Sequence, residues 1–275
     1  MTLPVAFTAH GSPMNALGGT PFTDALERWA KALPSPRAVL VVSAHWETRG
    51  LAVTGAAAPE TVHDFGGFPE PLYRIRYPAP GDPGLAHTVV ELLAAAGLEA
   101  RVDPLRGIDH GAWSPLLFLR PAADLPVVQL SLDRTRSLAG LVDVGRALRP
   151  LRDRDVLVLG SGNVVHNLRT ADFAHRDAPV EGWSREFDAW VKERVLDWDV
   201  DALAAPENGP FGRQAHPTLE HYVPLLVTAG AADPKPVPSF PWEGFEHATL
   251  SMRCVQFDAS EAPPATRSRP SPLAR

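Results

Sequence analysis

The sequence predicts an α/β protein, a three-layer α/β/α sandwich around a mixed, largely parallel central sheet. Short runs of branched apolar residues, almost unbroken by polar ones, occur at residues 4–10, 39–46 and 156–162. Such runs are typical of strands buried on both faces, as in the centre of an α/β sheet. Helical patterns separate these runs, and the order strand, helix, strand favours a parallel crossover.

The remaining elements can be assigned in chain order from spacing and flanking residues. Residues 21–33 place apolar side chains at helical spacing after Pro21, which is an acceptable first residue of a helix. Thr218 is a suitable N-cap for a helix that runs to residue 230. We further expect strands at 51–54, 98–102, 126–132 and 248–257, and helices at 84–96, 138–148 and 182–198.

Long irregular segments interrupt this pattern. Residues 56–83 carry the motif HDFGGFP, and their glycines and aromatic residues suit a lid over a crevice. A second glycine-punctuated loop is expected at 106–115. No linker divides the chain, so we expect one catalytic domain over residues 1–258, followed by a proline-rich, polar tail at 259–275 that is expected to be disordered.

Composition narrows the class of partner. The chain has 275 residues and a formal net charge of −6, which disfavours nucleic-acid and anionic-membrane surfaces as partners. No stretch approaches the roughly 20 apolar residues that a membrane span requires. We therefore expect a cytoplasmic protein that acts on small molecules. The sequence does not decide between a monomer and a homo-oligomer. Cys254 is the only cysteine, so a metal would be held by histidine and carboxylate.

Histidines follow three of the predicted strands. His10 and His45 stand at the ends of their strands, and His166 lies just beyond the third. The ligand crevice of an open α/β sheet lies at the carboxyl ends of the strands, so these side chains should converge there. His221, in a polar motif at the start of a helix, is a fourth member. Histidines with open coordination positions suit a catalytic Zn²⁺ or Fe²⁺.

His63 and His110 form a second pair of candidates. Each lies in a loop beside an aspartate, Asp64 or Asp109, and close to glycines that let the backbone approach a ligand. They either face the substrate or support a ligand, and stabilisation of the loop is the alternative interpretation. Three further histidines, His87, His175 and His247, are assigned to surface or structural roles.

Seven motifs in order carry a resemblance to a known family. The chain resembles the class III extradiol ring-cleavage dioxygenases, and within them it is most similar to the single-domain DOPA-4,5-dioxygenase group. The resemblance extends from residue 10 to about 257. The motifs are HGSPMNAL at 10–17, SAHW at 43–46, HDFGGFP at 63–69, YPAPGDP at 77–83, DHGAWSPL at 109–116, GSGNVVHNL at 160–168 and HPTLEHYVPLL at 216–226.

The resemblance implies a non-haem metal that holds a catechol and then O₂. His10 and His45 match the first two metal ligands, and His221 matches the third, with Glu220 as the runner-up. His166 matches the acid/base catalyst and is a further candidate ligand. Fe²⁺ is expected for activity, although Zn²⁺ can occupy such a site in isolated protein.

The implied reaction inserts both atoms of O₂ into a catechol beside its two hydroxyls, an extradiol cleavage. A catechol must lose protons to chelate a metal, and an imidazole can accept one near neutral pH. His110 and His63 are expected to hydrogen-bond to the reacting oxygen. A DOPA-like compound is one possible substrate, and the physiological catechol stays open.

Four residues are expected to contact the substrate: Ser12, Trp46, Phe65 and Phe68. Trp113 and Tyr222 are further aromatic candidates, and packing in the core is the alternative for all of these rings. Two other functions use the same histidines, namely a zinc-dependent hydrolase and a non-catalytic binding protein that has kept the pocket.

Overall fold

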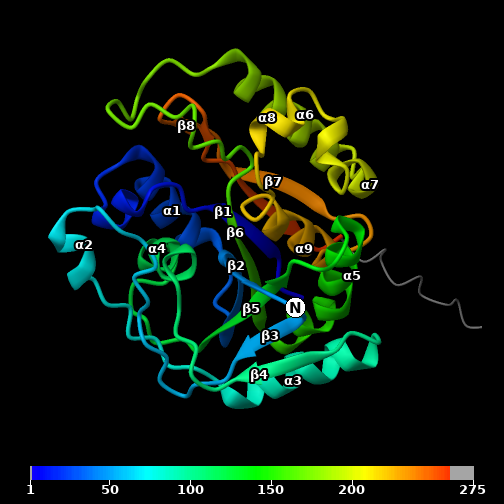
Figure 1. The fold of residues 1–275 in the computed structure, drawn as a ribbon. Helices are drawn as coiled ribbons and strands as arrows, with labels where there is room; N and C mark the ends of the chain where they lie inside the picture. The colour runs from blue at the N-terminus through cyan, green and yellow to red at the C-terminus, as the bar shows by residue number, and fades with distance from the viewer. Residues whose placement is uncertain (1, 261–275) are drawn as a thin grey trace, which may run out of the picture.

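An eight-stranded mixed sheet forms the centre of the molecule (Figure 1). The computed structural model describes residues 2–260. The strand order is β4-β3-β5-β2-β6-β1-β10-β7, and β8 pairs with β9 in a separate two-stranded sheet. The strands are β1 Val5–Ala9, β2 Ala38–Thr48, β3 Leu51–Thr54, β4 Ala100–Asp103, β5 Val127–Asp133, β6 Val156–Gly162, β7 Val237–Trp242, β8 Phe245–Glu246, β9 Leu250–Ser251 and β10 Cys254–Asp258.

The four central strands β5, β2, β6 and β1 are parallel, as the apolar runs predict. β6 lies between β1 and β2, so these two are joined by a crossover and are not direct neighbours. β3 pairs antiparallel with β5, and β10 pairs antiparallel with β1. The carboxyl ends of β1, β2 and β6 therefore meet at one edge of the sheet, which is where the histidines are expected.

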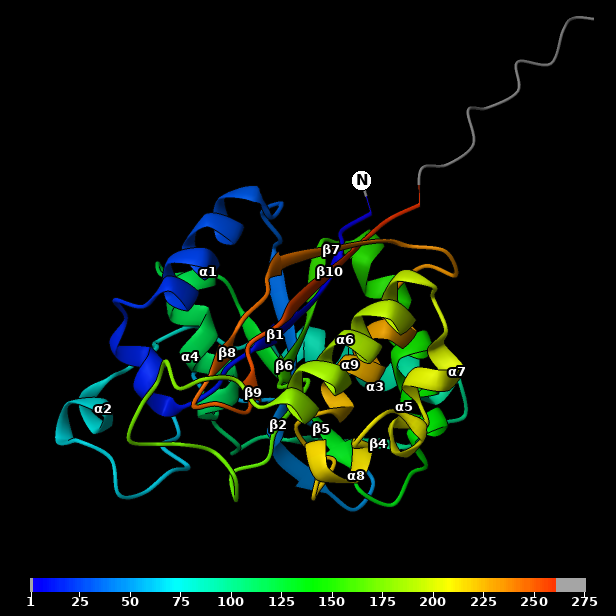
Figure 2. The same ribbon diagram turned by 90° about the horizontal axis from the view of Figure 1, so that it is seen from above.

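Helices cover both faces of the sheet, which makes the predicted three layers (Figure 2). α1 and α4 pack together on one face, while α5 and α9 pack together on the other. The α-helices are α1 Pro21–Ala32, α2 Glu70–Arg74, α3 Pro83–Ala95, α4 His110–Leu119, α5 Leu138–Leu148, α6 Gly182–Leu196, α7 Val200–Leu203, α8 Gly212–Ala215 and α9 Val223–Ala231, and the 3₁₀ helices are η1 Pro13–Leu17, η2 Arg149–Arg154 and η3 Pro206–Asn208.

Alternation along the central strands divides the core between the two faces. Leu40 and Val42 of β2 join the core beneath α5 and α9, whereas Val39 and Val41 join the core beneath α1 and α4. Full burial of an aliphatic side chain of this size contributes roughly 1.5–3 kcal/mol. Packing on both faces restricts the movement of the strand, and the residues at its end are therefore held in fixed positions.

Several predicted boundaries were wrong. α9 begins at Val223 and not at Thr218, because residues 217–222 form turns and Tyr222 is the N-cap. α4 already begins at His110, where the Asp109 side chain accepts a hydrogen bond from the backbone N–H of Ala112. The helix α2 lies within residues 56–83, which the sequence predicts to be irregular.

The last part of the sheet was only partly predicted. β7 was missed because it contains two prolines, which are confined largely to edge strands, and β7 is an edge strand. The expected strand over 248–257 divides into β9 and β10. The expected tail at 259–275 lies almost entirely outside the described residues. Within residues 2–260, no helix is both long enough and apolar enough to cross a membrane.

Candidate metal centre

Three histidines converge at the carboxyl edge of the parallel strands. His10 directly follows β1, and its backbone N–H donates to the carbonyl of Gly162 at the end of β6. His45 lies within β2, which continues to Thr48 and does not stop at His45 as predicted. The register of β2 against β5 shifts between Val42 and Glu47, so His45 lies in an irregular segment. Such irregularities re-aim side chains next to functional sites.

His221 reaches the same place through a close backbone contact. Its carbonyl accepts a hydrogen bond from the N–H of Asn163, at 2.9 Å. A Cβ atom on Gly162 would overlap this carbonyl, so only glycine lets the end of β6 approach the chain before α9 so closely. The contact brings a residue from late in the sequence next to His10.

Hydrogen bonds fix which nitrogen of each histidine faces the cluster. Ser161 donates its hydroxyl hydrogen to the carbonyl of Gly111, so its Oγ accepts from Nδ1 of His10, at 2.9 Å. Nδ1 of His221 lies 3.0 Å from Oε1 of Glu220, and Nδ1 of His45 lies 3.3 Å from Oδ2 of Asp64. The hydrogen bonds place the hydrogen of His10 and of His221 on Nδ1. The carboxylate of Asp64 faces Nδ1 of His45 and favours the same tautomer there, so each Nε2 keeps a free lone pair.

The free nitrogens are placed to share one ion. One ligand atom from each of His10, His45 and His221 lies within 4.8 Å of the other two. Nε2 of His10 is 3.1 Å from Nε2 of His45. Two nitrogens on one divalent ion, each about 2.1 Å from it, would be about 3 Å apart. The donor set and its spacing therefore fit a divalent transition metal.

Burial keeps these imidazoles neutral. It lowers the pKa of His10 and of His221 well below the ordinary value, and the neighbouring histidines lower both further. Burial, together with His110, lowers the pKa of His45 to about 4. A neutral imidazole is the form that binds a metal, so the ligands need not lose protons near neutral pH.

Asp64 links His45 to His110. Its Oδ1 accepts from both the backbone N–H and Nδ1 of His110, each at 2.9 Å, while Oδ2 faces His45. Burial opposes ionisation of Asp64, but the hydrogen bonds from His110 prevail and lower the pKa of the carboxyl to about 2. The carboxylate therefore stays charged and holds both rings in one orientation.

A second aspartate fixes the start of α4. Asp109 is fully buried, and its carboxylate accepts from Ser43 Oγ at 2.6 Å and from Gln129 Nε2 at 2.9 Å. Ser43 Oγ in turn accepts from the backbone N–H of His45, at 3.2 Å. A Cβ atom on Gly111 would overlap Ser43 Oγ, so glycine is required where α4 meets β2. This network couples the positions of His45 and His110.

His166 stands at the side of the cluster. Its ring stacks on that of His221 with centroids 3.4 Å apart and planes 8° from parallel. A ligand atom of His166 lies within 4.8 Å of ligand atoms of Glu220 and His221. The cluster of His10, His45 and His221 is a separate group that does not include His166. Burial lowers the pKa of His166 to about 4, so its imidazole is neutral at physiological pH.

The histidines open into a cavity of about 220 Å³. A cavity of about 150 Å³ holds benzene, so this volume suits a single aromatic ring with its substituents. Three of the four residues expected to contact the substrate line it: Ser12, Phe65 and Phe68. The full lining is His10, Gly11, Ser12, Pro13, His45, Asp64, Phe65, Phe68, His110, His166, Leu168, Phe173, His221 and Leu250.

Two of the candidate residues do not line the cavity. Trp46 is 6% exposed and packs beneath the guanidinium of Arg106, 5.4 Å from the ring centroid. His63 donates from Nε2 to the carbonyl of Ile75 at 3.0 Å, which matches the loop-stabilising alternative. The open aromatic candidates Trp113 and Tyr222 are fully buried and donate to backbone carbonyls in the core.

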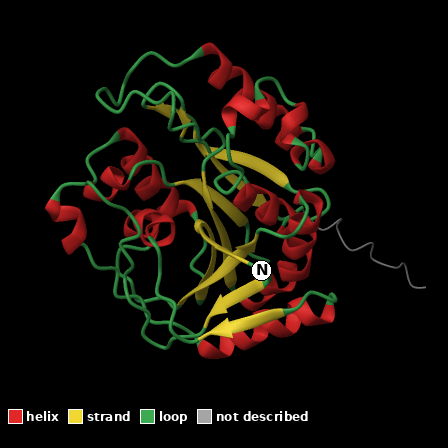
Figure 3. Ribbon diagram, viewed as in Figure 1, coloured by secondary structure: helices red, strands yellow, loops and turns green. Residues whose placement is uncertain are grey.

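Several lining residues were missed by sequence reasoning. Leu168 ends the motif at 160–168 but carries no signal of its own, and Phe173 and Leu250 lie outside the seven motifs. Asp64 follows His63 directly, and an acidic side chain within a glycine-rich loop is the sequence signal that indicates it. Most of residues 55–82 forms loop (Figure 3), and Asp64, Phe65 and Phe68 of this segment line the cavity.

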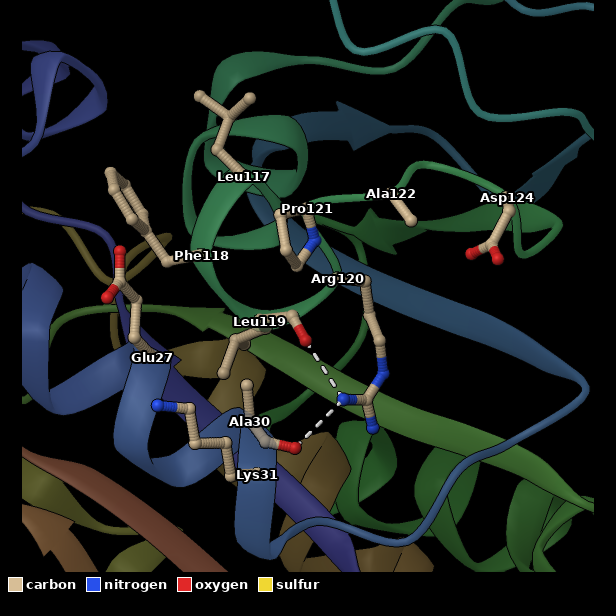
Figure 4. A pocket seen from close by; sticks show the side chains of 10 residues that line it. All are labelled: Glu27, Ala30, Lys31, Leu117, Phe118, Leu119, Arg120, Pro121, Ala122 and Asp124. Carbon is tan, nitrogen blue, oxygen red and sulfur yellow. Dashed lines mark hydrogen bonds between the residues drawn. The ribbon is translucent and has the colours of Figure 1, made fainter.

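Another cavity, of about 410 Å³, lies between α1 and the end of α4 (Figure 4). No histidine lines it, and the guanidinium of Arg120 is taken up by the carbonyls of Ala30 and Leu119. It therefore offers no comparable set of metal-binding side chains. The candidate active site is the smaller, histidine-lined cavity.

The fold and the site together define a class: an α/β/α protein with a histidine cluster able to hold a metal ion, beside a cavity large enough for one aromatic ring. Comparison with known proteins gives the family. A protein-family model described as the catalytic LigB subunit of aromatic ring-opening dioxygenase matches residues 5–257. The chain therefore belongs to this family, and the family and enzyme class expected from the seven motifs are confirmed.

Individual relatives agree with this assignment. The chain is 43% identical over 258 residues to the 4,5-DOPA dioxygenase extradiol of Escherichia coli (strain K12), covering 92% of this chain and 94% of that protein. It is 39% identical over 232 residues to the protein of the same name from Beta vulgaris, covering 82% and 85%. The crystal structure of an uncharacterized protein from Escherichia coli K12 matches with a TM-score of 0.80 and 39% identity, covering 92% of this chain and 99% of that one.

Proposed function

We propose that this chain catalyses extradiol cleavage of a catechol, inserting both atoms of O₂ beside the two hydroxyls. The observation that carries the proposal is the convergence of three histidines, each with its Nδ1 occupied, at the floor of a cavity sized for one ring. The names of the relatives from Escherichia coli and Beta vulgaris support the extradiol outcome. The family match over residues 5–257 supports a single catalytic domain at 1–258.

His10, His45 and His221 would hold the metal through Nε2. Glu220, the runner-up ligand, is engaged elsewhere, because its Oε1 accepts from Nδ1 of His221 and from the hydroxyl of Thr218. This arrangement favours Glu220 as the residue that orients His221. Three neutral ligands leave positions open for a catechol and for O₂.

Fe²⁺ is the proposed working metal. When bound, it would bring catechol and O₂ together and allow electrons to pass between them, which Zn²⁺ does not do. Sites rich in imidazole bind Zn²⁺ more tightly than Fe²⁺, so isolated protein can carry zinc and be inactive. The protein contributes the geometry of the site and the handling of protons.

His166 is the proposed base for a catechol hydroxyl. Its neutral ring lines the cavity and is held against His221, so it can accept a proton as the substrate binds. His110 has a complementary role. Its Nδ1–H donates to Asp64, which leaves Nε2 for a substrate oxygen, and Asp64 would stabilise the ring if Nε2 gained a proton. His63 would act indirectly by holding the lid segment through Ile75.

Apolar side chains orient the ring and exclude water. Phe65 and Phe68 meet edge to face with centroids 5.5 Å apart, and Phe65 also meets the ring of His110 at 5.3 Å. A catechol that enters between these rings and Leu250 would be held flat over the histidines. Ser12 stands at the rim, with its Oγ accepting from the N–H of Met14.

The test is product analysis after anaerobic loading with Fe²⁺. The loaded protein is given a catechol and isotopically labelled O₂, and the product is examined by mass spectrometry. Incorporation of both labelled atoms into one ring-opened semialdehyde is the expected result. Incorporation of no label, or hydrolysis of esters by the zinc-loaded protein instead, would favour a zinc hydrolase.

A further inference from the structure

A second cavity, of about 470 Å³, adjoins the histidine-lined cavity. Both cavities are lined by Ser12, Phe68 and Phe173, so the two border each other at these side chains. A catechol with a side chain could therefore place its ring over the histidines and its chain in the second cavity. The remaining lining residues of the second cavity are Met14, Ala174, Arg176 and His247.

Arg176 gives this side cavity its charge. Within residues 2–260 its guanidinium makes neither an ion pair nor a hydrogen bond, and only its backbone carbonyl is used, accepting from the N–H of His247. The nearby acids Asp172 and Glu246 are engaged, with His175 and with Asn15 respectively. Asp177 lines a neighbouring hollow that shares Arg176 but none of the histidines of the candidate site. A half-buried, unpaired guanidinium in a cavity is an anion-binding group.

His247 is held rigidly beside Arg176. It is 7% exposed, and its Nδ1 donates to the carbonyl of Asp172 at 3.0 Å, which leaves Nε2 free. His247 and Ala248 both adopt positive φ, at 55° and 66°. Positive φ in two consecutive residues other than glycine costs conformational free energy and is concentrated at ligand sites. The strained backbone thus presents His247 to the side cavity.

We propose that the side cavity is a subsite for a carboxylate on the side chain of the catechol, with Arg176 as the residue that pairs with it. The inference rests on the proposed function, because it assigns the position of the ring to the histidine-lined cavity. It makes Arg176 the residue that distinguishes an acidic from a neutral side chain on the catechol. Neutral alkylcatechols would lack the ion pair, and their side chains would leave Arg176 unpaired.

The test compares two substrates that differ only in the carboxylate: dihydrocaffeate and the corresponding ethylcatechol. The measured quantity is the ratio of kcat/KM for the acid to kcat/KM for the neutral compound, with iron-loaded protein. Loss of a charge-assisted hydrogen bond should lower this ratio about tenfold in Arg176→Gln. Arg176→Lys, which keeps the charge, should retain most of the preference.

A matched control is Arg101→Gln, because Arg101 is exposed on the edge strand β4 and lines neither cavity. This control should keep the ratio of the unmodified protein. An unchanged ratio in Arg176→Gln would overturn the subsite, even if kcat/KM fell equally for both substrates. If Arg176→Gln fails to fold, an absence of any preference for the acid in the unmodified protein and in Arg176→Lys would overturn it equally.

Anaerobic calorimetry separates the two proposals. If dihydrocaffeate binds through Arg176 but is not cleaved, the subsite stands and the proposed function fails. If both catechols are cleaved with equal kcat/KM in every variant, the proposed function stands and the subsite fails.

Discussion

Replacement of Asp64 by asparagine should weaken metal binding while the fold stays intact. The carboxylate accepts two hydrogen bonds of 2.9 Å from His110 and faces Nδ1 of His45 at 3.3 Å. An amide keeps only one oxygen. If that oxygen stays with His110, the NH₂ group faces the Nδ1–H of His45. The ring of His45 would then have to move, or carry its hydrogen on Nε2, the nitrogen assigned to the metal.

The expected loss follows from the role of Asp64 as the partner of a ligand. Removing such partners typically lowers metal affinity by about 10- to 100-fold, or roughly 1.4–2.8 kcal/mol. The contact with His45 is long, so we expect about a tenfold rise in the Kd for Zn²⁺ or Co²⁺, measured by competition with a chromophoric chelator.

The matched control is Asp143→Asn. Asp143 lies on α5 with its side chain 58% exposed, and among residues 2–260 it pairs only with Arg146. Its replacement should therefore leave the Kd within about twofold. Thermal unfolding of the apo forms should differ little. If Asp64→Asn binds metal as tightly as the unmodified protein, while His45→Ala does not, the proposed orienting role of Asp64 is wrong.

The remaining predictions concern the other roles in the site and one buried ion pair. His166→Ala should keep its metal and lose ring cleavage, measured as metal content and oxygen uptake on one preparation; loss of the metal would place His166 among the ligands. His221→Ala should lower metal affinity far more than Glu220→Ala, and equal losses in the chelator competition would contradict the assignment of the third ligand. Burial opposes ionisation of Asp233, but the hydrogen bond from the buried guanidinium of Arg152, at 2.6 Å, holds the pKa of this carboxyl below its ordinary value. The pair should stabilise the fold above about pH 4 and lose this contribution as the pH falls through the lowered pKa. The free energy of unfolding in urea should therefore fall less steeply with acid in Asp233→Asn than in the unmodified protein. Equal pH dependence of this free energy in the two proteins would contradict the assignment.

The central part of the site could be predicted because strands constrain their ends. Once residues 4–10, 39–46 and 156–162 are read as parallel strands buried on both faces, His10 and His45 must lie at the carboxyl edge of the sheet. The position of His221 could not be derived in this way. It depends on the backbone contact with Gly162, which only the folded chain reveals.

The parts that could not be predicted lie where local pattern is weak. Phe173 and Arg176 belong to an irregular segment whose side chains have no periodicity to indicate burial. Trp46 is expected from the sequence either to contact the substrate or to pack in the core. Neighbours along a strand face opposite sides, and Trp46 packs against Arg106 and does not line the cavity. The ends of the strands therefore indicated the histidine cluster better than adjacency in the sequence indicated the groups around it.

The most direct test of the central claim is oxygen consumption by protein loaded anaerobically with Fe²⁺ and supplied with a catechol. The proposed function predicts uptake of one O₂ for each catechol consumed, together with a new visible or near-ultraviolet absorption band from the ring-opened product. No uptake by protein with confirmed iron occupancy, across neutral and acidic catechols, would contradict it.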